Sequence, residues 1–183
     1  MIIDKDFEGL IIKDDYYILN EDIVTDSNLD IKVKLLVLGS IKAGGWIKAG
    51  GWIEAGGSIE ADDWIKAGNW IESGGWIKAG GSIKADDWIK AGGSIEAGDW
   101  ITAGNWIEAG GSITMLGIKT RELKIIYGMK WPVWILDTHI KVGCYLNSRE
   151  KWKNMSENEI DYMDEVGALE FYKKNKDWIL NIK

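Results

Sequence analysis

The side chains most often used in catalysis are scarce in this chain of 183 residues, which has one histidine and one cysteine. His139 and Cys144 lie five positions apart in WILDTHIKVGC, where polar and apolar residues alternate as in a strand. A lone histidine and a lone cysteine on one short strand are weak evidence for a base and its nucleophile, and we expect one to be buried and the other exposed. We therefore predict no catalytic residue and no enzymatic activity.

Acidic side chains gather at a few positions and raise the question of a metal site, because carboxylates are common ligands of hard cations. The candidates are Asp62, Asp63, Asp86, Asp87 and Asp99. All of them lie where tight turns are expected, so the favoured interpretation is that they are solvated corners. The sequence also lacks the G-x-x-x-x-G-K-[ST] motif of phosphate-binding loops. We expect neither a metal nor a cofactor.

A six-residue repeat positions most of these side chains. From Ser40 to Gly111 the chain consists of twelve units of the form [SW]-I-[KET]-[AS]-[GD]-[GDN]. Isoleucine is always second, and alanine is always fourth except at Ser73. This alternation predicts a strand with Ile and Ala buried, and with Trp, Ser and the charged residues outside. The opposite orientation would bury an unpaired charge in nearly every unit.

The last two positions of each unit hold residues that tolerate the left-handed backbone of a tight corner. Short strands separated by such corners predict a β-solenoid in which successive coils pair edge to edge. Weaker copies upstream place five residues at the isoleucine position, so we expect the coils to begin near residue 10: Ile11, Tyr17, Ile23, Leu29 and Leu35.

Three units per coil would give a triangular solenoid with 18 residues per turn. Stacking every third unit places Trp52, Trp70, Trp88 and Trp106 in one column. A second face then carries Lys48, Lys66, Lys84 and Thr102, and a third alternates Lys42, Glu60, Lys78 and Glu96, which is a favourable charge ladder. Four units per coil match the Trp and Ser positions nearly as often. The residues leave the coil size and the hand of the coil open.

The C-terminal part, residues 118–183, predicts a small α+β domain that covers the open strand edge of a solenoid spanning residues 1–117. Strands are expected over 124–127, 132–136 and 139–143, with turns at Gly128 and Asp137–Thr138. Ser148 is suited to cap a short helix that holds Trp152. The Ser156–Glu159 capping box opens a longer helix with a break at Gly167, and its buried candidates are Ile160, Met163, Leu169, Phe171, Trp178 and Ile179.

The formal net charge of −7 disfavours direct nucleic-acid binding and favours basic partners. A single cysteine excludes an internal disulfide, and no apolar run approaches the roughly 20 residues of a membrane-spanning helix. The N-terminus, MIIDKDFEGL, lacks the basic and then apolar pattern of a signal peptide, so we expect a cytoplasmic protein without membrane contact.

The repeats resemble the hexapeptide-repeat β-helix family over roughly half of the chain. This resemblance implies a triangular, left-handed coil. Many members are acyltransferases that use a histidine at a coil boundary, whereas residues 1–138 contain no histidine. The stretch from THIKVGC to KNKDWI also resembles a terminal segment of uncharacterised phage and prophage repeat proteins. That resemblance implies a phage or mobile-element protein inside a bacterial cell.

The outward tryptophans are the strongest pointer to a function, because an exposed indole column provides a large apolar surface. The partner-binding candidates are Trp52, Trp70, Trp88, Trp106, Glu54, Glu72, Asp62, Asp63, Asp86 and Asp87. The leading hypothesis is a protein-binding solenoid, in the phage setting an anti-CRISPR-like inhibitor of a host defence complex with partial DNA mimicry. The alternatives are a structural protein that dimerises through a Trp face and, least favoured, an acyltransferase.

Overall fold

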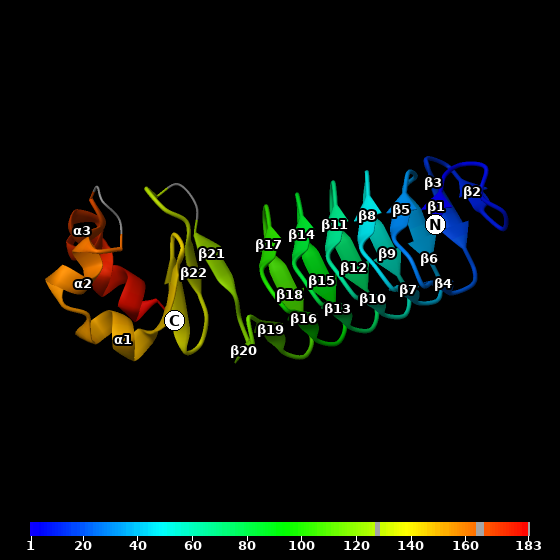
Figure 1. The fold of residues 1–183 in the computed structure, drawn as a ribbon. Helices are drawn as coiled ribbons and strands as arrows, with labels where there is room; N and C mark the ends of the chain where they lie inside the picture. The colour runs from blue at the N-terminus through cyan, green and yellow to red at the C-terminus, as the bar shows by residue number, and fades with distance from the viewer. Residues whose placement is uncertain (127–128, 164–166, 183) are drawn as a thin grey trace. The chain divides into compact units, whose positions relative to one another are not determined.

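The computed structural model describes residues 1–126, 129–163 and 167–182. The chain divides into two compact units, Met1–Arg121 and Glu122–Lys183 (Figure 1). The first is a β-solenoid, as the repeat predicted. The second combines an antiparallel sheet with helices. No helix among the described residues has both the length and the apolar composition needed to cross a bilayer.

Parallel strands of the solenoid form three sheets, here named A, B and C (Figure 1). Sheet A has the order β1 (Ile2–Ile3), β5 (Leu29–Ile31), β8 (Ile47–Ala49), β11 (Ile65–Ala67), β14 (Ile83–Ala85) and β17 (Ile101–Ala103). Sheet B has the order β18 (Ile107–Ala109), β15 (Ile89–Ala91), β12 (Ile71–Ser73), β9 (Ile53–Ala55), β6 (Leu35–Val37), β3 (Tyr16–Leu19) and β2 (Ile11–Lys13). Sheet C has the order β20 (Ile118–Thr120), β19 (Ile113–Met115), β16 (Ile95–Ala97), β13 (Ile77–Ala79), β10 (Ile59–Ala61), β7 (Ile41–Ala43) and β4 (Ile23–Thr25).

The register of these sheets fixes the coil at three units. Ile59 pairs with Ile41 on one side and with Ile77 on the other, so each coil advances by 18 residues. The alternative of four units per coil is therefore excluded. Because the spacing is constant, each residue type of the repeat lies directly above its equivalent in the preceding coil.

Isoleucine and alanine line the interior, as the alternation predicted. The isoleucines from Ile41 to Ile101 are at most 1% exposed, and their alanine partners are also buried. Ser73, the one exception at the alanine position, donates a hydrogen bond from its hydroxyl to the carbonyl of Gly57 at 2.8 Å. This bond satisfies a polar group that would otherwise be costly to bury.

Two hairpins interrupt the winding, and the repeat pattern did not predict either. Strands β2 and β3 pair antiparallel through the turn at Asp14, whose φ of 52° is left-handed. Ile11 is therefore not at an interior isoleucine position, and it is 48% exposed. Winding also begins before residue 10, because β1 already pairs parallel with β5.

The second hairpin stops the coils at their C-terminal end. Leu116 and Gly117 both have positive φ, 52° and 73°, and this two-residue turn reverses the chain. As a result β20 returns antiparallel to β19 instead of starting another coil.

Sheet D of the second unit is antiparallel, with the order β21 (Lys124–Ile126), β22 (Val133–Ile135), β23 (His139–Val142) and β24 (Tyr145–Ser148). The first three strands match the predicted ones, and β24 was not predicted. Of the expected first strand and turn, residue 127 and Gly128 lie outside the described residues.

The helices α1 (Arg149–Asn154), α2 (Glu157–Asp161) and α3 (Ala168–Asn181) follow the predicted caps. Ser148 caps α1, and both hydrogen bonds of the capping box are present at Ser156 and Glu159. The expected longer helix ends earlier than predicted, because α2 stops at Asp161 and α3 begins after Gly167. Ile160 and Ile179 are buried, but Trp178 is 48% exposed, so its predicted burial was wrong. Adjacent positions on a helix point about 100° apart, and Ile179 takes the inward direction.

The close stacking of corners yields a test with a matched control. A Cβ atom at Gly74 would lie 2.2 Å from the carbonyl oxygen of Gly56 in the preceding coil, whereas a Cβ at Gly50 would meet nothing within 4 Å. We expect Gly74→Ala to lower the free energy of unfolding by about 1–3 kcal/mol because the coils must separate locally. Gly50→Ala should change it by less than about 1 kcal/mol, towards higher stability. Urea unfolding of both variants measures this, and equal losses would contradict it.

Candidate functional site

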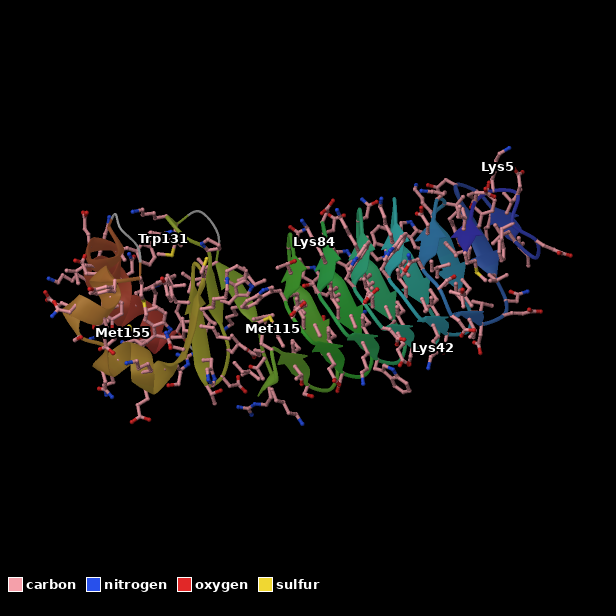
Figure 2. The ribbon with its side chains drawn as sticks, in the orientation of Figure 1. Lys5, Lys42, Lys84, Met115, Trp131 and Met155 are labelled. Atoms are coloured by element: carbon pink, nitrogen blue, oxygen red, sulfur yellow. The ribbon has the colours of Figure 1, made fainter. Side chains whose placement is uncertain are left out.

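Each sheet of the solenoid presents one outer face to the surroundings, and the three faces differ in chemistry. Face A carries Lys48, Lys66 and Lys84 in one row, because β8, β11 and β14 pair in register. Face C carries the alternating row of Lys42, Glu60, Lys78 and Glu96. Lys42 and Lys84 project from different sides of the coils (Figure 2).

Face B holds the predicted tryptophan column. The rings of Trp52, Trp70, Trp88 and Trp106 stack with interplanar angles of at most 7° and with successive centroid distances of 5.3, 5.3 and 5.0 Å. This column, the indole ladder, follows from the coil spacing of about 4.8 Å, which suits offset stacking of aromatic rings.

The ladder covers itself to a large extent. Trp52 is only 7% exposed, since Trp70 stacks on one side and the ring of Tyr16 lies on the other at 5.7 Å between centroids. Trp106, the last ring, is 44% exposed. Tyr16 was missed by the sequence analysis, although it precedes Trp52 by two coil lengths.

Beside the ladder lies an unfavourable pair of like charges. Glu54 and Glu72 are direct neighbours on β9 and β12, and Glu72 also forms an ion pair with Lys90 at 3.4 Å. Burial, and secondarily the charge of Glu72, raises the pKa of Glu54 above its ordinary value. A cationic side chain placed here would offset the repulsion between the two carboxylates and favour the charged form of Glu54.

The predicted acidic corners do not converge. Asp62 and Asp63 follow β10 at the corner from sheet C to sheet A, whereas Asp86 and Asp87 follow β14 at the corner from sheet A to sheet B. Asp99 lies two coils beyond Asp63. Among the described residues no group of three or more His, Cys, Asp and Glu side chains is placed to hold a metal ion.

His139 and Cys144 are also kept apart. His139 begins β23, and its ring nitrogen Nδ1 lies 2.9 Å from the hydroxyl of Thr138. Cys144 is exposed in the turn beyond the other end of the same strand. The four-residue strand β23 spans roughly 10 Å from its first residue to its last, and Cys144 lies beyond its far end, so the two side chains are not placed for one to activate the other.

The second unit contains an apolar cavity of about 270 Å³ that the sequence did not indicate. Helices α1 and α3 and the turn after β23 surround it, and its walls include Trp131, Trp152, Phe171, Tyr172 and Ile179. Two polar groups of its walls are bonded within the unit: Trp152 donates its indole N–H to the Ile140 carbonyl, and Tyr172 donates its hydroxyl to the Trp152 carbonyl. Cys144, Tyr145 and Lys176 also line the cavity, so its walls are largely but not wholly apolar.

No family model, curated protein or solved structure matches this chain. The assignment as a β-solenoid therefore depends on the strand register and the buried interior described above.

The indole ladder gives a second prediction. Trp88→Ala removes two ring contacts and leaves a gap in the column, so we expect the free energy of unfolding to fall by about 2–4 kcal/mol. Trp76→Ala is the matched control, since Trp76 is 54% exposed and its neighbours in the adjacent coils are Ser58 and Ser94. Its loss should stay within about 1 kcal/mol. Urea unfolding and near-ultraviolet circular dichroism measure both effects; similar results for the two variants would refute a stabilising ladder.

The raised pKa of Glu54 gives a prediction with a defined sign. In the folded state the carboxyl group of Glu54 favours its protonated form. Ionising it therefore lowers the free energy of unfolding, and this loss is absent below the ordinary pKa of 4.5 and complete once the pH has risen through the higher pKa of the folded state. Glu54→Gln should therefore be more stable than the unaltered chain at neutral pH, and this advantage should vanish in acid. Glu108→Gln, at an exposed position of the same row, is the control. Thermal unfolding is measured from below pH 4.5 up to neutral pH, and a stability advantage of Glu54→Gln that persisted below pH 4.5 would disprove the prediction.

Proposed function

We propose that this chain is a non-enzymatic, protein-binding β-solenoid that recognises a basic surface of its partner through face B. The observation that carries the proposal is the like-charged pair Glu54 and Glu72, which lie in the same repeat units as Trp52 and Trp70, on the face whose exposed ring, Trp106, lies two coils beyond Trp70. Carboxylates next to indole rings are suited to arginine and lysine, which form ion pairs with the first and cation–π contacts with the second.

The rigidity of the scaffold supports a binding role. Glu54 and Glu72 lie on strands β9 and β12, which are each hydrogen-bonded to a strand on both sides, so little backbone freedom remains to be lost there on association. Aromatic residues are also enriched among the residues that dominate binding energies at protein interfaces. Trp106 combines such a side chain with substantial exposure.

A narrower form of the proposal is that the partner is a host defence complex and the chain a phage or mobile-element inhibitor. It is supported by the resemblance of the C-terminal segment to phage repeat proteins and by the net charge of −7. Partial DNA mimicry would use the outward carboxylates of face B such as Glu54 and Glu108. Glu60, Glu72 and Glu96 are less suited, because each is paired with a lysine.

The test is affinity capture from a bacterial lysate with three forms of the purified chain. The face B variant combines Glu54→Gln, Glu72→Gln and Trp106→Ala, and the control combines Lys48→Gln, Lys66→Gln and Lys84→Gln on face A. We expect the unaltered chain and the control to retain the same protein, and the face B variant to lose roughly tenfold or more in affinity.

Two outcomes would count against the proposal: no specific protein retained, or equal retention by all three forms. Circular dichroism of each form checks that the coils remain folded. The narrower proposal requires in addition that the retained protein belong to a nuclease complex and that the unaltered chain inhibit its cleavage of DNA.

A further inference from the structure

The three outer faces differ in the charges that would come together if the same face of two copies of the chain were in contact. On face A, Lys66 and its neighbours would face lysines again, and on face B the central residues Glu54 and Glu72 would face each other. Like charges placed directly opposite are destabilising. Face C alone alternates in sign, and its ion pairs Lys42–Glu60 and Lys78–Glu96, at 3.7 and 3.8 Å, leave the row neutral.

The row of charges on face C is complementary to the same row taken in reverse order. Along the six parallel strands from β4 to β19 its outward residues are Val24, Lys42, Glu60, Lys78, Glu96 and Thr114. A twofold axis between β10 and β13 would place every lysine of one copy opposite a glutamate of the other. The same operation places Val24 opposite Thr114, so no position in the row meets an unfavourable neighbour.

The second column on this face supplies an apolar contact. It consists of Asp22, Ser40, Ser58, Trp76, Ser94 and Ser112. Trp76 is therefore a single indole among short polar side chains, and at 54% it is the most exposed tryptophan of the repeats. Under the same twofold axis Trp76 of one copy lies over Ser58 of the other. The two indoles then occupy adjacent coil levels, about 4.8 Å apart, which is the spacing of the indole ladder.

We propose that two copies of this chain associate antiparallel through face C, about a twofold axis between β10 and β13. The interface is isologous, since each copy contributes the same residues. The six strands are each three residues long, and together with the residue that precedes each of them they form a strip of roughly 400 Å² per copy, or about 800 Å² in total. That total is below the roughly 1,000 Å² of a stable specific interface, so the dimer is weak, with a dissociation constant that is roughly micromolar or higher. Face B stays free, and the inference is independent of the proposed binding function.

Charge reversal on face C tests this with a matched control. Lys78→Glu places a glutamate opposite Glu60 of the second copy and should weaken dimerisation by roughly tenfold or more. Lys84→Glu makes the same change in net charge on face A and should leave dimerisation within roughly twofold of the unaltered chain. Sedimentation equilibrium at concentrations extending to the millimolar range measures both, and thermal unfolding confirms that the variants fold.

Inverting every charge of the face C row gives a second test. The variant with Lys42→Glu, Glu60→Lys, Lys78→Glu and Glu96→Lys keeps the alternation, so it should dimerise with itself but not with the unaltered chain. Trp76→Ser removes the apolar contact and should weaken the dimer without changing any charge. The inference is overturned if the unaltered chain is monomeric at the highest concentration, if Lys78→Glu and Lys84→Glu behave alike, or if the inverted and unaltered chains mix freely.

Discussion

The parallel hydrogen-bond register of the coils is the constraint on which the other features depend. Since each strand pairs with the one 18 residues away, every side chain is stacked on its equivalents at a single fixed spacing. Isoleucine and alanine fill a narrow interior in the regular coils, and larger residues take the alanine position only in the coils towards the two ends, for example at Ile31, Val37 and Met115. Outward side chains stack at the same spacing but are not confined by a closed interior. Each outer position therefore forms a row along the solenoid in which one residue type is repeated or two types alternate.

The outer rows show how one backbone can support surfaces with different properties. Repetition of tryptophan on face B gives a ladder that shields its own members and exposes mainly its last ring, Trp106. Repetition of charge gives self-repulsion, as in the lysines of face A, whereas alternation on face C gives ion pairs. Surface ion pairs contribute little to stability, so their arrangement bears mainly on which surface each face can meet.

The second unit follows different physics. Its core is built from sheet D and three helices around Val133, Ile140, Trp152 and Ile179, and its helix ends are fixed by local caps. Glu159, which closes the capping box and pairs with Lys151, has its pKa lowered to about 2 by these hydrogen bonds. Glu159 therefore keeps its charge, and the cap its ion pair, to a lower pH than an ordinary glutamate would.

By itself the sequence determined the solenoid, the inward Ile and Ala and the helix caps, because each depends on local periodicity or on a short motif. The coil size needed the tertiary structure, since three or four units satisfied the same residue pattern and only strand pairing distinguishes them. The hairpins at Asp14 and at Leu116–Gly117 were not predicted, because a left-handed backbone is uncommon at Asp and Leu and the six-residue pattern does not mark where the winding reverses. The exposure of each tryptophan also depended on the tertiary structure. Trp52 and Trp76 occupy the same position in the repeat, but Trp52 is buried by its stacked neighbours and Trp76 lies between serines of the adjacent coils.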